Sequence, residues 1–163
     1  MTPHRIPLRT AAVLAALLLA SALASPARAA AIDYGAVNAA IVTDHLLPRY
    51  HAFTAKTAAL SRAVGKLCPS VEPTDLDAAR NAFHGALDAW QEVEHLRQGP
   101  AAMADTHIRV KFWPDRKSLV DKHLARLMAN KNGDILKPDS FAHVSVAVQG
   151  FPALERLLFA KDA

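Results

Sequence analysis

Apolar side chains recur at helical spacing through the first half of the chain. Between residues 32 and 67 the stripe repeats every three or four residues, the period of a helix that packs against other helices. Its members are Phe53, Thr57, Leu60, Val64 and Leu67. Pro48 lacks a backbone N–H, so we expect it to kink or restart this helix.

A second apolar stripe predicts a second helix. It is formed by Leu76, Ala79, Phe83, Leu87 and Trp90. Thr74, with Asp77 three residues later, has the spacing of a capping pair at the start of this helix. Gly99-Pro100 is a stop signal, so we expect the helix to end at about Arg97.

The second half of the chain is less regular. Residues 101–116 predict a long, partly extended loop, because Ile108, Val110 and Phe112 alternate with polar residues. Ser118 and Asp121 then have the spacing that caps a short helix, which should stop at Asn132-Gly133.

Asp139 predicts the start of a further helix, although alternating valines at 144, 146 and 148 also fit a strand; the neighbouring helical pattern favours the helix. Gly150 should break it, and Pro152 should begin a last helix. Together the patterns predict an all-α bundle of about four or five helices.

The first 29 residues have the order of a secretory signal. Arg5 and Arg9 precede an apolar run over 11–24, and small residues follow it, which predicts cleavage after Ala29. The run is shorter than the roughly 20 residues of a membrane-spanning helix. We therefore expect an exported protein of the periplasm or cell envelope, without a transmembrane anchor once residues 1–29 are removed and with a helical domain over 30–163.

The charge balance and the cysteine content limit the kinds of function that we expect for this chain. The signal segment contains three of the 19 Lys and Arg residues and none of the 15 Asp and Glu residues. Its removal leaves 16 basic against 15 acidic residues, without the concentrated basic face that nucleic-acid binding requires. Cys68 is the one cysteine, and in an exported protein it indicates either a free thiol or a missing partner.

Two candidate sites lie near the end of the second predicted helix. Glu92 and His95 have the Glu-x-x-His spacing of iron sites in helical bundles, but such sites need a second copy that this chain lacks. The pair is also projected away from the apolar stripe, which favours a solvated polar face over a weak metal pair.

Glu94 and Arg97 are instead placed on the continuation of the apolar stripe when the helix is projected at about 100° per residue. They predict either a partly buried ion pair at the end of the bundle or the floor of a site. Glu155 lies beside Gly150 and either points into the same pocket or acts as a carboxylate favoured at a helix start.

The remaining histidines, His45, His51, His107, His123 and His143, have no ligand spacing in the sequence, so only the fold can show whether any of them converge. Motifs of familiar hydrolases, such as Gly-x-Ser-x-Gly and His-Glu-x-x-His, are absent from the sequence.

Four segments together resemble the imelysin family, also called peptidase M75. They are residues 79–91 with Ala79-Arg80-Asn81-Ala82-Phe83-His84 and Ala89-Trp90-Gln91, Leu96-Arg97-Gln98-Gly99-Pro100, Lys111-Phe112-Trp113-Pro114-Asp115, and Val148-Gln149-Gly150-Phe151-Pro152-Ala153-Leu154-Glu155. The resemblance extends from about Ile32 to the end of the chain. It implies a helical protein of the cell envelope that is linked to iron acquisition.

The resemblance also implies a metal motif, Gly-x-His-x-x-Glu, which this sequence keeps only in part. Gly150 and Glu155 match, whereas the histidine position is Pro152, which has no nitrogen to bind a metal. A catalytic zinc ordinarily has three protein ligands and an open position. Glu155 is therefore the one metal ligand that the motif carries over, and the metal, if bound, would be iron or zinc.

Family domains continue beyond this motif, so we expect the chain to correspond to the N-terminal part of such a domain. The function expected from the sequence is a non-catalytic binding role in metal handling or uptake, above all of iron, with the ion or iron-uptake components as partners. The alternatives are an M75-type metallopeptidase and a truncated remnant that acts only with a partner.

Overall fold

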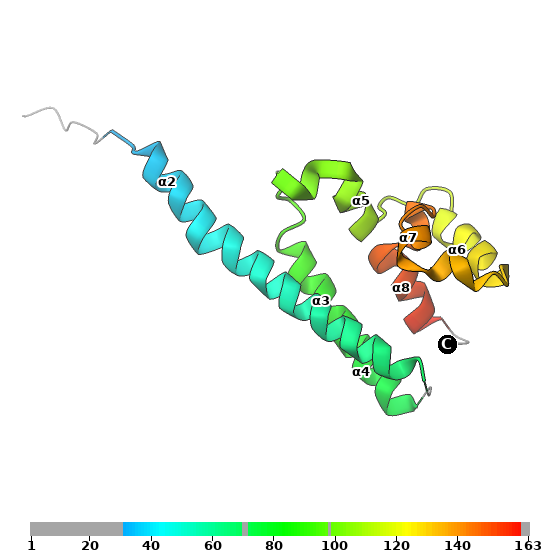
Figure 1. The fold of residues 1–163 in the computed structure, drawn as a ribbon. Coiled ribbons are helices and arrows are strands. Elements are labelled where there is room, and N and C mark those ends of the chain that lie inside the picture. Colours follow the sequence, from blue (N-terminus) through cyan, green and yellow to red (C-terminus); the bar gives the residue numbers. More distant parts are fainter. Residues whose placement is uncertain (1–30, 70–71, 98, 161–163) are drawn as a thin grey trace, which may run out of the picture. The chain divides into compact units, whose positions relative to one another are not determined.

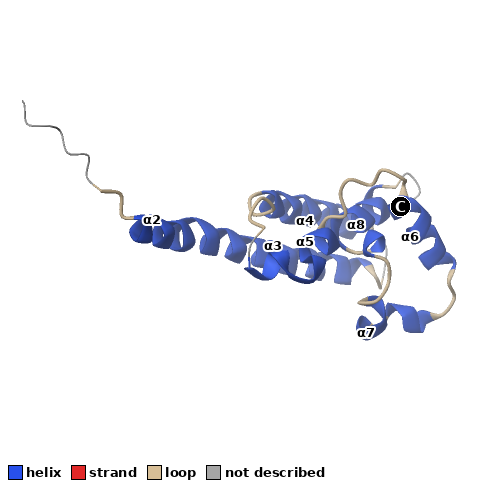
Figure 2. Cartoon of the chain, turned by 90° about the horizontal axis from the view of Figure 1, so that it is seen from above, coloured by secondary structure: helices blue, strands red, loops and turns tan. Residues whose placement is uncertain are grey.

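The computed structural model describes residues 31–69, 72–97 and 99–160, and every regular element in these ranges is a helix (Figures 1 and 2). The prediction of an all-α fold is confirmed. The predicted signal segment lies outside the described residues. No helix in the described ranges is long and apolar enough to cross a membrane.

The chain divides into two units, residues 1–36 and residues 37–163. Of the first unit, residues 31–36 are described. There the carboxylate of Asp33 accepts a hydrogen bond from the N–H of Ala36 at 3.0 Å, at the start of helix α2 (Tyr34–Ala40). Such a side chain satisfies one of the N–H groups that a helix start leaves without a partner.

Pro48 sets the local geometry at the start of the second unit. A π-helical segment, η1 (Ile41–Leu46), directly precedes α3 (Leu47–Leu67), and Pro48 lies in the first turn of α3. Proline cannot donate to the carbonyl four residues before it and its ring crowds that carbonyl. The N–H of Leu47 donates to Val42, five residues back, so the wider π turn makes room for the proline and the α-helix restarts as predicted.

Helices α3 and α4 (Pro73–Gln91) pack side by side as a hairpin (Figure 1). The core lies along α4 and is closed by the last helix, α8 (Gly150–Phe159). Aromatic rings interlock there, with centroids 5.6 Å apart for Phe83 and Phe151. The buried members of this core are Leu60, Ala79, Phe83, Ala86, Trp90, Val93, Phe151 and Leu158.

Both predicted ends of α4 were wrong. The helix starts at Pro73, after an extended Glu72, and not at a Thr74 cap, because a proline at the first position already has the helical φ. It ends at Gln91 and not near Arg97. Val93 donates to Trp90, three residues back, at 2.9 Å, and this tighter turn keeps Val93 buried in the core.

The predicted extended loop over 101–116 was wrong in its first part. A 3-10 segment, η2 (Gly99–Asp105), which is interrupted at Met103 and Ala104, leads into the short helix α5 (Thr106–Val110). The backbone becomes extended at Lys111. The alternation was misleading because α5 is too short to show a helical period and its residues are all half-buried.

Helix α6 (Leu119–Ala129) lies where the pattern predicted it, and Val120 and Leu124 are buried. It is followed by the short elements η3 (Gly133–Leu136), α7 (Pro138–Phe141) and η4 (Val146–Val148).

The helix predicted from Asp139 through Val148 was wrong, since only its ends are helical, and the alternative strand does not form either. Gln149 explains the break: its side-chain amide donates to the carbonyl of Val144 at 3.0 Å, which satisfies a carbonyl that a continuous helix would have used.

Candidate functional site

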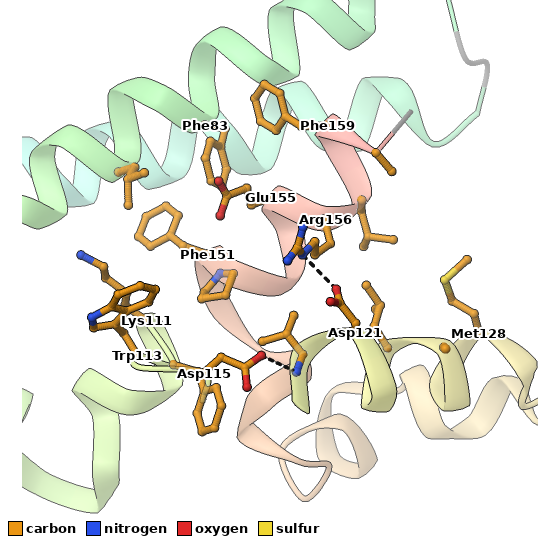
Figure 3. A pocket seen from close by; sticks show the side chains of 18 residues that line it. Phe83, Lys111, Trp113, Asp115, Asp121, Met128, Phe151, Glu155, Arg156 and Phe159 are labelled. Carbon is orange, nitrogen blue, oxygen red and sulfur yellow. Dashed lines mark hydrogen bonds and ion pairs between the residues drawn. The ribbon is translucent and has the colours of Figure 1, made fainter. Parts of the chain in front are cut away.

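A cavity of about 860 Å³ lies against α8, between α4, α6 and the extended segment after α5 (Figure 3). Most of its walls are apolar, and five aromatic rings contribute to them: Phe83, Phe112, Trp113, Phe151 and Phe159. Ligand sites in proteins are typically of this size and are mostly apolar, with a few placed polar groups. Trp113 and Met128 are 77% and 70% exposed, respectively, so much apolar surface is accessible in this region.

Helix α8 contributes to this cavity two residues of the segment in which the sequence predicted a partial metal motif. Pro152 and Glu155 both line it. The carboxylate of Glu155 is exposed and has no hydrogen bond or ion pair to any described residue. Among the described residues that line the cavity, Glu155 is therefore the one acidic side chain without a hydrogen bond or an ion pair.

Gly150 has a structural reason to be glycine. Its φ is +70°, and a Cβ at this position would collide with the backbone carbonyl oxygens of Arg109 and Val110. The start of α8 can thus lie directly against the end of α5. This contact fixes the position of the helix that carries Glu155.

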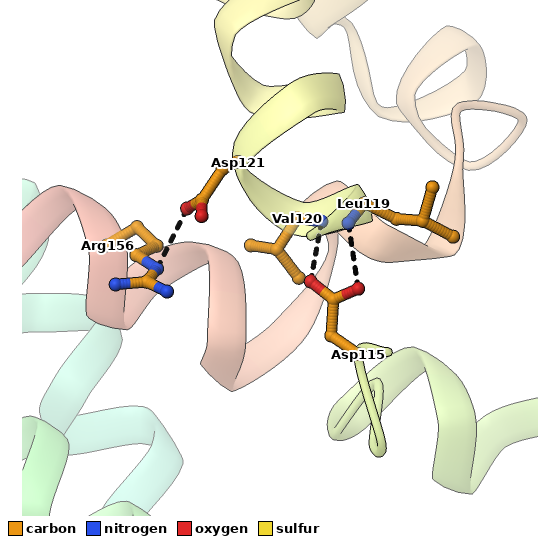
Figure 4. A network of polar contacts seen from close by, with 5 residues as sticks. All are labelled: Asp115, Leu119, Val120, Asp121 and Arg156. Carbon is orange, nitrogen blue, oxygen red and sulfur yellow. Dashed lines mark hydrogen bonds and ion pairs between the residues drawn. The ribbon is translucent and has the colours of Figure 1, made fainter. Parts of the chain in front are cut away.

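Asp115 is a polar group of the cavity wall that the sequence reasoning missed. Its carboxylate accepts hydrogen bonds from the N–H groups of Leu119 at 2.7 Å and Val120 at 3.0 Å, and it thereby caps α6 (Figure 4). The pKa of Asp115 lies below its ordinary value of 3.8. The hydrogen bond from Val120 is the main cause and that from Leu119 adds to it, although desolvation acts in the opposite direction.

The predicted cap, Ser118, makes no side-chain capping bond and has a left-handed backbone, with φ +51°. The prediction was wrong because Asp115, three residues earlier, reaches the same N–H groups. A capping residue that a turn separates from its helix is difficult to find in sequence, because its offset from the helix depends on the shape of that turn.

Two ion pairs neutralise other charges around the cavity. Arg156 on α8 pairs with Asp121 on α6, at 2.9 Å between Nε and Oδ1 (Figure 4). Lys111 pairs with Glu94 at 2.8 Å, which connects the extended segment to the turn after α4.

The structure therefore corrects the predicted partner of Glu94. Its carboxylate binds Lys111, whereas Arg97 is exposed and does not line the cavity. The projection that placed Arg97 on the apolar stripe assumed a helix to about residue 97, and the helix ends at Gln91. Glu94 itself does not line the cavity, but it forms an ion pair with Lys111, which does.

Glu92 and His95 lie apart from the cavity, on the exposed side of the α4 end. Glu92 approaches Arg49 of α3 at 3.8 Å, and the ring of His95 lies 6.2 Å from that of His45 in η1. Among the described residues, no group of three or more His, Cys, Asp or Glu side chains is placed to hold a metal ion.

The comparisons with known proteins give one match. The family model of imelysin (peptidase M75) matches residues 46–163. No curated protein and no solved structure matches the chain.

Proposed function

Because the chain belongs to the imelysin family, we propose that it is an exported binding protein with a non-catalytic role in metal handling, above all of iron, and that the cavity against α8 is its binding site. The observation that carries the proposal is the placement of Glu155 in the wall of a large and mostly apolar cavity, where no described residue forms a hydrogen bond or ion pair with its carboxylate.

The shape and lining of the cavity favour binding over hydrolysis. A metal-dependent hydrolase needs a metal held by several protein ligands, with one position open for water. Here Pro152 stands where the family motif has its histidine, and it lines the same cavity as Glu155. The volume exceeds that of a single ion, so the apolar walls would hold the organic part of the bound ligand.

The charges of the lining favour a cationic ligand. Lys111, Asp115, Asp121, Glu155 and Arg156 carry two positive and three negative charges in total. Asp115 is engaged with the α6 backbone, and Asp121 is engaged with Arg156. Glu155, which no described residue pairs with, thus supplies the negative charge that a metal or its complex would meet.

Calorimetric titration of the purified protein with Fe²⁺ and Zn²⁺ tests the role of Glu155. We expect weak binding that Glu155→Gln reduces, and tighter binding by Pro152→His, since a histidine and a glutamate three residues apart on a helix can meet. Glu72→Gln, at an exposed carboxylate before α4, is the control and should leave binding unchanged.

Cleavage of an unfolded protein substrate, with and without a chelator, tests the alternative of a metallopeptidase. We expect no cleavage. Chelator-sensitive cleavage that is lost in Glu155→Gln would overturn the non-catalytic proposal and would favour the M75-type peptidase.

A further inference from the structure

Two histidines that are 50 residues apart in the sequence face one another outside the cavity. His45 lies in the π-helical segment η1, and His95 lies in the turn that follows α4. Their ring centroids are 6.2 Å apart, with the ring planes at 61°. We propose that this pair is a second metal site, which takes a borderline divalent ion such as Cu²⁺ between the two imidazoles.

The separation of the rings suits a shared ion. A metal at about 2.0–2.1 Å from an imidazole nitrogen lies roughly 3.2 Å from the centre of that ring. Two rings on opposite sides of one ion are then about 6.4 Å apart at most and closer at a tetrahedral angle. The ring centres of His45 and His95 are already within this limit.

Both rings are accessible for binding. His95 is exposed and His45 is half-buried, and neither belongs to a buried core cluster. Imidazole ligands suit Cu²⁺, Ni²⁺ and Zn²⁺, and copper binds most strongly in this series. Water fills the remaining coordination positions, so the site is a two-histidine site and needs no third side chain.

Two neighbouring charges tune the site in opposite directions. Arg49 donates to the carbonyl of His45 at 3.3 Å and approaches Glu92 at 3.8 Å. Its positive charge disfavours a cation nearby, and it holds the carboxylate of Glu92. Arg49→Gln should therefore strengthen Cu²⁺ binding severalfold, because it removes the repulsion and releases Glu92 toward the ion.

The test is titration of the whole purified protein with Cu²⁺, followed by calorimetry and by the nitrogen hyperfine pattern in electron paramagnetic resonance. We expect His45→Ala and His95→Ala each to weaken binding by at least about tenfold and to remove one nitrogen from the pattern. His51→Ala, at an exposed histidine of α3, is the matched control and should bind as the unmodified protein does.

Thermal unfolding gives a second reading, because an ion that binds only the folded chain raises Tm. Cu²⁺ should raise the Tm of the unmodified protein and of Glu155→Gln, but not that of the double variant His45→Ala/His95→Ala. Equal binding by the double variant and the unmodified protein would overturn the proposal. Loss of Cu²⁺ binding in Glu155→Gln alone would place the metal in the cavity and would support the proposed function instead.

Discussion

Asp115 fixes the start of α6 from outside the helix. Two hydrogen bonds from backbone N–H groups to one carboxylate satisfy donors that the helix start would otherwise leave without partners. Helix α6 supplies one wall of the cavity, so this residue connects a local backbone requirement to the shape of the candidate site.

Asp115→Asn should lower Tm in a pH-dependent way. The pKa of Asp115 is lowered in the folded state, so its carboxylate stabilises the fold above its ordinary pKa of 3.8 and loses this effect as pH falls through the lowered value. Tm measured from neutral pH to below pH 3.8 should show the gap between the two proteins close on acidification. Ser118→Ala, which removes no capping bond, should show little gap at any pH.

Gly150 allows the close approach of α8 to α5. Gly150→Ala should lower the free energy of unfolding by at least about 2 kcal/mol, because the new Cβ meets backbone carbonyls at a left-handed φ. Gly65→Ala is the matched control. Gly65 lies in α3 with open space around it, so this change should stabilise the protein by up to about 1 kcal/mol. Denaturant unfolding of both variants would show these opposite signs, and a neutral Gly150→Ala would contradict the account.

At the scale of the elements, Arg80 joins α4 to the end of α8. Its Nε donates to the carbonyl of Leu158 at 2.8 Å, and its guanidinium carbon lies 5.5 Å from the centre of the Phe159 ring. The C-terminal end of a helix carries partial negative charge, so a cation at this place stabilises it. The sequence pattern gave no sign of this contact, because it joins residues 78 positions apart.

Arg80→Ala should therefore lower the free energy of unfolding by about 1–3 kcal/mol, through loss of a charge-assisted hydrogen bond and of the contact with Phe159. Arg80→Lys keeps the charge but not the planar fork and should recover part of the loss. Arg62→Ala, at an exposed position of α3, should stay within about 0.5 kcal/mol of the unmodified protein. Equal losses in the Arg80 and Arg62 variants would rule out the specific role.

The long helices were predictable from the sequence and the short ones were not. The stripes on α3 and α4 identified their core-facing residues, because a helix of three or more turns repeats its period often enough to be recognised. Residues 99–118 and 133–149 form short turns that depend on contacts made elsewhere, such as that of Gln149 with Val144. The end of α4 was predicted six residues too late, and this one error misplaced Arg97.

For the whole molecule, Glu155 is the one residue of the candidate site that the sequence identified as such. Glu155 was a candidate both from its position beside Gly150 and from the family resemblance, and it lines the cavity. Trp113 and Met128 were not identified as candidates, since nothing local distinguishes an exposed apolar side chain beside a cavity from one in a core. His45 and His95 come close together because His45 lies in a π turn and because α4 ends before His95. A projection of an ideal helix at about 100° per residue includes neither of these features.

The unequal exposure of the two tryptophans provides an optical measure of the cavity. Trp90 is 4% exposed in the core, whereas Trp113, at the cavity, is 77% exposed. Iodide in solution should quench the emission of Trp113 and leave that of Trp90 almost unchanged. A molecule that enters the cavity should shield Trp113, shift the emission to shorter wavelength and reduce the quenched fraction, and Trp113→Phe should abolish all three responses. Candidate ligands can therefore be ranked by fluorescence alone, without a label and before any activity is known.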